Sequence, residues 1–137
     1  MNPGKYIYDK LSTDVGIASI VGTRIRPQLN LSAETIDLPY IVYTVDSNQP
    51  SNQKGTLTGV SNLDVVSVTI TFFHNNYNSL VDGGAAVRRV LDYSVGSGSY
   101  ANIQHVSFQG EGHEYDENYK PRGLYILNQS YQFRITR

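Results

Sequence analysis

The 137-residue chain contains no cysteine and no tryptophan. The absence of cysteine excludes disulfides and thiolate chemistry, and it leaves the redox compartment undecided. No apolar run approaches the roughly 20 residues that a membrane-spanning helix needs. The first residues, Met1 to Lys5, also lack the apolar stretch of a signal peptide. We therefore expect a protein without a membrane partner that is made, and assembles, in a cytoplasm.

Charge is scarce as well. Charged residues make up 17% of the chain, and the net charge is −1. A general nucleic-acid-binding protein carries a basic stripe, so this composition disfavours that class. The eleven tyrosines suit protein–protein interfaces, because each joins an apolar ring to a polar hydroxyl. The plainer interpretation, that tyrosine fills strands, remains open for about half of them.

Apolar periodicity predicts three helices, at residues 3–12, 15–21 and 76–93. Ser12 or Asp14 is expected to cap the second helix, because a short polar side chain there accepts a bond from a free helix N–H. Asn75 or Asn76 is expected to cap the third in the same way. The pair Gly83-Gly84 costs about 1 kcal/mol of helix stability per glycine. We expect these small residues to let the helix lie close on a sheet.

Alternating apolar and polar residues predict four strands, at Tyr40–Val45, Leu63–His74, Ile103–Gln109 and Leu124–Thr136. Arg24 to Arg26 form a short extended segment that Pro27 stops. Each long strand has one polar face, which is typical of an antiparallel sheet covered by helices on one side only. The predicted fold is a single α+β domain over residues 1–137, with a mainly antiparallel sheet of about four strands and helices packed on one face. The expected core consists of Val68, Ile70, Phe72, Leu80, Val87, Leu91, Tyr131 and Phe133.

Two long polar segments, 47–60 and 110–123, are predicted to be loops between strands. Loops of this length are uncommon in compact domains unless they are functional, although plain disorder is the alternative for the first. The second segment is acidic and holds the densest ionisable cluster of the chain: Glu111, His113, Glu114, Asp116 and Glu117. Its spacing matches neither a calcium loop nor a zinc motif, so a solvated loop is the favoured interpretation.

The sequence contains none of the catalytic or phosphate-binding motifs that we considered. No serine lies in a Gly-x-Ser-x-Gly elbow, and the stretch Gly96 to Ser99 lacks the lysine of a phosphate-binding loop. His74 and His105 are lone histidines in strand contexts, which favours structural roles. The strand Val66 to Phe73 does not match the aromatic and basic pattern of an RNA-binding sheet. We therefore predict no catalytic, cofactor-binding or metal-binding residues and no enzyme activity.

Four blocks of sequence, in this order, resemble the tail-completion (tail-terminator, head-to-tail joining) proteins of long-tailed bacteriophages. The blocks are a helix and glycine turn at Tyr8–Ile25, the run Leu38-Pro39-Tyr40-Ile41-Val42-Tyr43 to Ser47, the helix ending Ala85-Ala86-Val87-Arg88-Arg89-Val90-Leu91, and Tyr115-Asp116 with Arg122 before the closing strand. Each block is weakly specific alone. Their order and the 137-residue length carry the resemblance.

The resemblance implies a structural subunit of a virion. Such a subunit closes the tail tube as a homohexameric ring, contacts the tail tube protein and the head connector or stopper protein, and lets DNA pass through its hole without reading it. Its location would be the neck of the virion. The alternative is a small ligand- or peptide-binding α+β domain without catalysis.

For the ring subunit, the two polar segments are the expected contact surfaces. The contact residues, between subunits or with a neighbouring ring, are predicted to be Gln49, Pro50, Asn52, Lys54, Thr56, Leu57, Glu111, Glu114, Tyr115, Asp116, Glu117 and Tyr119. The acidic ones are alternatively expected to line the hole, where they would repel the phosphate backbone of DNA over roughly 8 Å at physiological salt.

Overall fold

A computed structural model of the chain describes residues 3–22, 24–27, 39–51, 63–92, 102–117 and 124–136. These ranges hold helices α1 (Pro3–Thr13), α2 (Val15–Val21) and α3 (Tyr77–Leu91), and strands β1 (Ile25–Pro27), β2 (Tyr40–Ser51), β3 (Leu63–His74), β4 (Asn102–Asp116) and β5 (Leu124–Thr136). The strands form one sheet in the order β1-β2-β3-β5-β4. None of the described helices is long and apolar enough to cross a membrane.

The α+β class is confirmed, but the sheet has five strands rather than about four. The additional strand is the extended segment around Arg26, which pairs with β2 in parallel through Ile25 and Ile41. The other three pairings are antiparallel. The pairing of this segment could not be predicted, because three residues carry too little periodicity to place them in a sheet.

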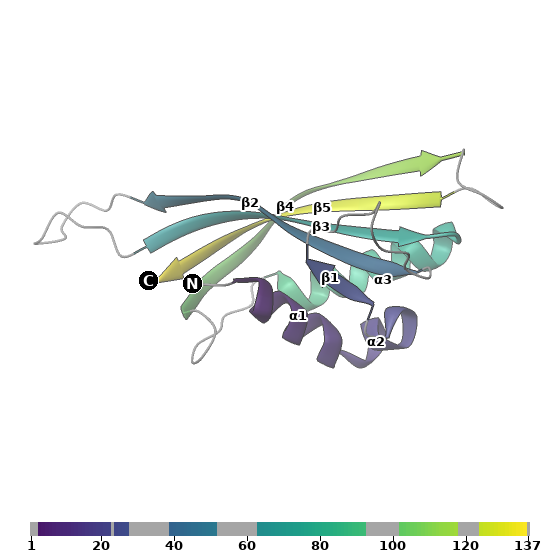
Figure 1. Cartoon of the computed structure of the whole chain (residues 1–137), viewed down its shortest axis with the longest axis horizontal. Coiled ribbons are helices and arrows are strands. Elements are labelled where there is room, and N and C mark those ends of the chain that lie inside the picture. The colour runs from purple at the N-terminus through teal and green to yellow at the C-terminus, as the bar shows by residue number, and fades with distance from the viewer. Residues whose placement is uncertain are drawn as a thin grey trace, which may run out of the picture.

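The helices all lie on one side of the sheet, and the core fills the space between (Figure 1). α1 packs against β1 and β2, whereas α3 packs against β3, β5 and β4. The alternating residues of β3, from Val66 to Phe72, are buried under these helices, as are Tyr131 and Phe133 of β5. All eight residues of the expected core are buried. The strand faces are therefore those that the alternation predicts.

The helix ends form as their sequences favour. Asp14 caps α2, since its Oδ2 accepts a hydrogen bond from the Ile17 N–H at 3.0 Å. Asn76 caps α3 by accepting from the Ser79 N–H at 3.2 Å. Gly22 ends α2 with φ at 59°, a left-handed conformation that glycine adopts without steric cost.

The glycine pair lets α3 approach the sheet closely. A Cβ on Gly83 would lie 2.6 Å from Cε2 of Phe72, and a Cβ on Gly84 would overlap Cδ2 of Leu127. Real Cβ atoms do not approach carbon this closely, so only glycine fits at both positions without movement of the sheet side chains. The expectation that small residues allow close contact is confirmed.

Both segments predicted to be long loops begin as strands, so those boundaries were wrong. Gln49 and Pro50 belong to β2 and pair with Val65 and Asp64 of β3, after an irregularity in register between Val45 and Ser47. Residues 110–116 belong to β4 and pair with β5 as far as Leu124. The remainders of the predicted loops, 52–60 and 118–123, lie outside the described residues.

Candidate interaction surface

The joined ends of β4 and β5 meet the start of α3 at one end of the molecule (Figure 1). Four rings gather there in a chain of contacts. The Tyr77 ring lies 5.5 Å from that of Tyr125 and 5.8 Å from that of His113, and the Tyr115 ring lies 4.8 Å from that of Tyr125. We call this group, with the neighbouring Val81, the aromatic cluster.

The aromatic cluster is unusually open to solvent. Tyr77 is 44% exposed and Tyr115 is 56% exposed. Val81, one turn after Tyr77 on α3, is also exposed. Three of the five large apolar side chains that are exposed in the described residues therefore lie in this one cluster. Tyrosines in such a setting are the side chains that dominate binding at protein–protein interfaces.

A line of hydrogen bonds ties the cluster to the core. The Tyr77 hydroxyl lies 3.0 Å from Nδ1 of His113, and Nε2 of His113 lies 3.2 Å from Glu111. Nε2 of Gln129 donates to Glu111 at 2.9 Å and to the carbonyl of Gly84 at 2.9 Å. The end of the β4–β5 hairpin is thereby fixed on α3 at the point where the helix lies closest to the sheet.

Gln129 is the buried polar centre of this network. It is 1% exposed, and its Oε1 accepts a hydrogen bond from the Tyr131 hydroxyl at 2.8 Å. Burial raises the pKa of Tyr131, so this hydroxyl keeps its proton. Burial also acts to raise the pKa of Glu111, but hydrogen bonds from Gln129 and His113 outweigh it and the pKa is lowered. Glu111 is therefore a charged and internally bonded carboxylate.

The carboxylates beside the cluster divide between two faces. Glu114 and Asp116 pair with Ile126 and Leu124, on the opposite face of the hairpin from Tyr115. Both are exposed, as is Glu117 in the turn that follows. The end of the hairpin thus carries aromatic rings on the helix side and carboxylates on the other. We call the aromatic cluster together with Glu114, Asp116 and Glu117 the hairpin tip.

The structure brings together only part of the predicted contact set. Glu111, Glu114, Tyr115, Asp116 and Glu117 lie together at the hairpin tip. Gln49 and Pro50 lie in β2, which runs toward the other end of the molecule (Figure 1). The remaining residues of the set lie outside the described residues: Asn52, Lys54, Thr56, Leu57 and Tyr119.

Sequence reasoning missed Tyr77, Val81 and Tyr125 as members of this surface. Apolar periodicity places Tyr77 on the apolar stripe of α3 and Tyr125 on the inner face of β5. Both lie at the extreme end of their element, where the helix and sheet no longer cover each other. The usable signal was this position, because the first turn of a helix and the end of a strand can reach beyond the part of the core that other elements cover.

The face of the sheet away from the helices is mixed in character. Hydroxyl and amide side chains lie near its centre, and strand alternation also sends Val42, Phe73, Arg26, Arg134, Glu114 and Asp116 to it. Cross-strand rows run from Val42 through Thr71 to Asn128, and from Thr44 through Thr69 to Ser130. Thr71 donates to Asn128 at 2.9 Å, and Thr69 donates to Asp46 at 2.5 Å. In the described part of the chain, no helix covers this face. We call it the uncovered face.

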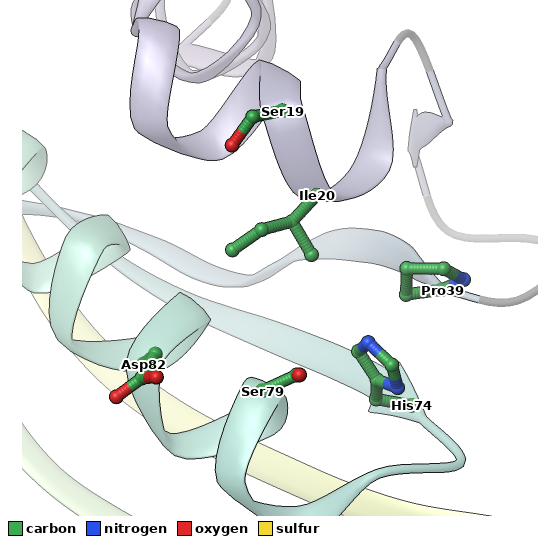
Figure 2. A pocket seen from close by; sticks show the side chains of 6 residues that line it. All are labelled: Ser19, Ile20, Pro39, His74, Ser79 and Asp82. Atoms are coloured by element: carbon green, nitrogen blue, oxygen red, sulfur yellow. The ribbon is translucent and has the colours of Figure 1, made fainter.

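An open hollow of about 360 Å³ lies between α2, the start of β2 and the start of α3, lined by Ser19, Ile20, Pro39, His74, Ser79 and Asp82 (Figure 2). Burial lowers the pKa of His74, and its Nδ1 accepts from the Asn76 N–H at 3.0 Å. Within the described residues, no hydrogen bond joins His74 to Ser79 or Asp82. The hollow therefore contains a serine, a histidine and an aspartate, but they lack the hydrogen bonds that connect the residues of a catalytic triad.

No three histidine, aspartate or glutamate side chains of the described residues lie close enough to hold a metal ion. This includes the acidic cluster, in which alternation along β4 sends His113 and Glu114 to opposite faces.

No family model matches the chain, and no curated protein does. Solved structures do match. One is a chain of the virion of a native gene transfer agent particle, with a TM-score of 0.71 and 14% sequence identity. The match covers 96% of this chain and 92% of that chain. The protein therefore shares its fold, over nearly its whole length, with a component of a virion.

Proposed function

We propose that this chain is a structural protein of a phage-like virion, and that it acts as a tail-terminator subunit. The observation that carries the proposal is the fold match to a virion chain over 96% of the sequence. The four-block sequence resemblance to tail-completion proteins supports the finer assignment. In this role, six copies form a ring at the top of the tail tube, between the tube protein and the head connector or stopper protein, in the neck of a virion assembled in a host cytoplasm.

Two surfaces suit a ring subunit. Closed rings use two different patches of each subunit, so a ring needs separate contact surfaces at separate places on the fold. The hairpin tip supplies one such patch, with exposed tyrosines beside carboxylates. The centre of the uncovered face, where Thr69, Thr71, Asn128 and Ser130 lie together, suits the lumen, because hydroxyl and amide side chains form no ion pairs with DNA.

Mass determination tests the ring directly. A closed ring of six copies has a mass of about 92 kDa, which is six times 15.3 kDa. We expect size-exclusion chromatography with light scattering to give this mass, either for the purified chain or for the chain mixed with tail tube protein. Electron micrographs of assembled tails should place the subunit at the end of the tail that joins the head.

Two results would contradict the proposal at different levels. A ring with a number of subunits other than six would contradict the predicted hexamer but not the tail-terminator role. A chain that stays monomeric in both preparations and never joins a particle would remove the role itself. The latter result would favour the ligand- or peptide-binding alternative, for which the hollow beside His74 is the place to look.

A further inference from the structure

We propose that the hollow beside His74 binds a lysine residue of a neighbouring protein chain in the particle. The inference rests on the proposed function, because a ring subunit needs contacts with its neighbours. It goes beyond that function by naming a site and the chemistry of its ligand. In this arrangement the ammonium group of the lysine lies at Asp82, its aliphatic stem lies along Ile20, and its backbone carbonyl accepts a hydrogen bond from His74.

The walls of the hollow are fixed by hydrogen bonds between elements. Nε of Arg24 donates to the carbonyl of Pro39 at 2.8 Å, and Nη2 of the same guanidinium lies 3.4 Å from the carbonyl of Ile20. One arginine thereby ties the end of α2 to the start of β2. Before α3, the Asn76 N–H donates to Nδ1 of His74 at 3.0 Å and fixes the turn that follows β3. The hollow is therefore formed before a ligand enters it, which lowers the entropy cost of binding.

Three polar side chains that line the hollow keep unused hydrogen-bonding capacity. Nδ1 of His74 accepts from a backbone N–H, and burial lowers the pKa of the ring, so the neutral ring carries its proton on Nε2. In the described part of the chain, this Nε2, the Ser79 hydroxyl and the Asp82 carboxylate take part in no hydrogen bond or ion pair. Figure 2 shows the three side chains along one side of the hollow, with Ile20 facing them from α2.

The order of these groups matches a lysine residue. Ser79 and Asp82 are three residues apart on α3, so they share a helix face and are separated by roughly 4.5 Å along the axis. The unpaired carboxylate of Asp82 favours a cation at its end of the hollow. The half-buried Ile20 offers apolar surface to an aliphatic stem. At the other end, the N–H of His74 and the hydroxyl of Ser79 suit a carbonyl oxygen.

Charge distinguishes the two ends of the hollow. Arg24 is bonded to Pro39, which lies on the same side of the hollow as His74, whereas Asp82 lies on the far side (Figure 2). One end therefore prefers an oxygen and the other a cation, and a lysine residue carries both. Because an exposed ion pair contributes little, a single hollow binds weakly. Six hollows in a ring bind a ring of partners together, which raises the overall affinity without any new contact.

A capped lysine, Nα-acetyl-lysine methylamide, tests binding to the purified chain. We expect this probe to shift the NMR signals of His74, Ser79 and Asp82, with a Kd on the order of millimolar. The matched probe is Nα-acetyl-norleucine methylamide, which keeps the four-carbon stem and lacks the ammonium group. It should bind about fivefold more weakly, since an exposed ion pair contributes at most about that factor.

A matched pair of variants tests the role of the carboxylate. Asp82→Asn should weaken binding of the lysine probe about fivefold and leave binding of the norleucine probe unchanged, because it removes the charge and keeps the shape. Glu117→Gln makes the same change in net charge at an exposed position outside the hollow, and it should leave both probes unaffected. Equal binding of the two probes to the unmodified chain, or equal effects of the two variants, would overturn the inference.

Zero-length cross-linking identifies the source of the lysine in assembled rings or tails. A carbodiimide condenses a carboxylate with an amine that contacts it, so mass spectrometry should find Asp82 joined to a lysine. The sequence of the joined peptide distinguishes a second copy of this chain from the tail tube, connector or stopper protein. Assembled particles in which Asp82 is joined to no lysine would overturn the contact.

Failure of the proposed function gives a different result. The unmodified chain would then form no ring with or without tail tube protein, while the two probes still report on the hollow in the purified chain. A ring that forms from a chain whose hollow does not distinguish the probes leaves the proposed function standing and removes this site alone.

Discussion

At the scale of single residues, the contact between Gly83 and Phe72 decides how closely α3 lies on the sheet. A methyl group at Gly83 would lie 2.6 Å from Cε2 of the Phe72 ring, a rigid side chain that is 1% exposed. Glycine at position 83 lowers the helix propensity of α3, but it lets the helix bury the Phe72 ring. The burial of the ring offsets the loss of propensity.

We expect Gly83→Ala to destabilise the fold by about 1–3 kcal/mol, because overpacking outweighs the gain in helix propensity. At Ala85, two residues further along α3 and exposed, the reverse change Ala85→Gly should cost about 1 kcal/mol from helix propensity alone. Chemical denaturation measures both. A stabilising Gly83→Ala would show that the helix moves away from the sheet at little cost.

Phe72→Ala should cost about 3–5 kcal/mol, since it leaves a cavity in a fully buried site. Phe72→Leu removes the ring edge that faces Gly83, so Gly83→Ala should be better tolerated in that background. A double-mutant cycle between these changes should therefore give a favourable coupling energy. Strict additivity would mean that the two positions do not share the space between helix and sheet.

Asp14 joins two roles, as the cap of α2 and as the ion-pair partner of Arg89 at 2.9 Å. The hydrogen bond from Arg89 and the helix N–H groups lower its pKa below 3.8, against the opposing effect of burial. A lowered pKa means that Asp14 stabilises the fold fully above its ordinary pKa and loses this effect as the pH falls through the folded value.

We expect Asp14→Ala to cost about 0.5–2 kcal/mol at neutral pH, the usual loss for a helix cap. Asp14→Asn should cost less, because asparagine keeps the cap and loses only a pair whose arginine is largely exposed. The difference between wild type and Asp14→Asn should shrink as the pH falls below 3.8. Thermal unfolding measured from pH 7 to pH 3 tests this, and a constant difference would contradict it.

At the scale of elements, the sequence predicted all three helices of the described residues, the four long strands and the core, but not where β2 and β4 end. β3 and β5 alternate clearly because one of their faces is buried. Residues 47–49 and 110–116 do not, because they are largely open to solvent on both faces, and both faces tolerate polar side chains. Such a segment is extended because its neighbour offers hydrogen bonds, and a single sequence does not contain that information.

Strand alternation also explains which features of the candidate site could be predicted from the sequence. The acidic residues of the hairpin tip were recognised from their density along the chain. Their separation from the rings of Tyr77 and Tyr125 by strand alternation was not, because a loop has no alternation. Once 110–116 is known to be a strand, the two-faced character of the tip follows from its period of two residues.

We predict that residues 52–62, which join β2 to β3, make contacts in the assembly. Replacing these residues with a short turn should leave the monomer fold intact, because β2 and β3 stay paired from Tyr40 to Ser51. We expect the shortened protein to unfold as the wild type does and to lose contacts between subunits or with a neighbouring ring. Circular dichroism and ring mass measure the two effects separately. Normal assembly by the shortened protein would contradict a contact role for this segment.

At the scale of the whole molecule, charge decides how DNA passes through a ring. If six copies form the proposed ring with this end toward the hole, the exposed carboxylates of Glu114, Asp116 and Glu117 would repel phosphate within about a Debye length, roughly 8 Å at physiological salt. Replacing all three with lysine should stall DNA passage or neck assembly. Glu111 is left unchanged because it holds Gln129 in place. Infectious particles at normal yield would show that the tip neither lines the hole nor contacts a neighbour.

The twelve-residue pairing of β3 with β5 has a mechanical consequence. The β2–β3 and β4–β5 hairpins point to opposite ends of the molecule, and β3 with β5 is the link between them (Figure 1). Because antiparallel hydrogen bonds lie across the strands, tension along the strand axis loads many of them at once in shear. Tension across the strands breaks them one after another. A subunit held at its two hairpins should therefore resist far larger forces along its length than across it, and the proposed function would use this resistance to keep a ring closed during DNA passage.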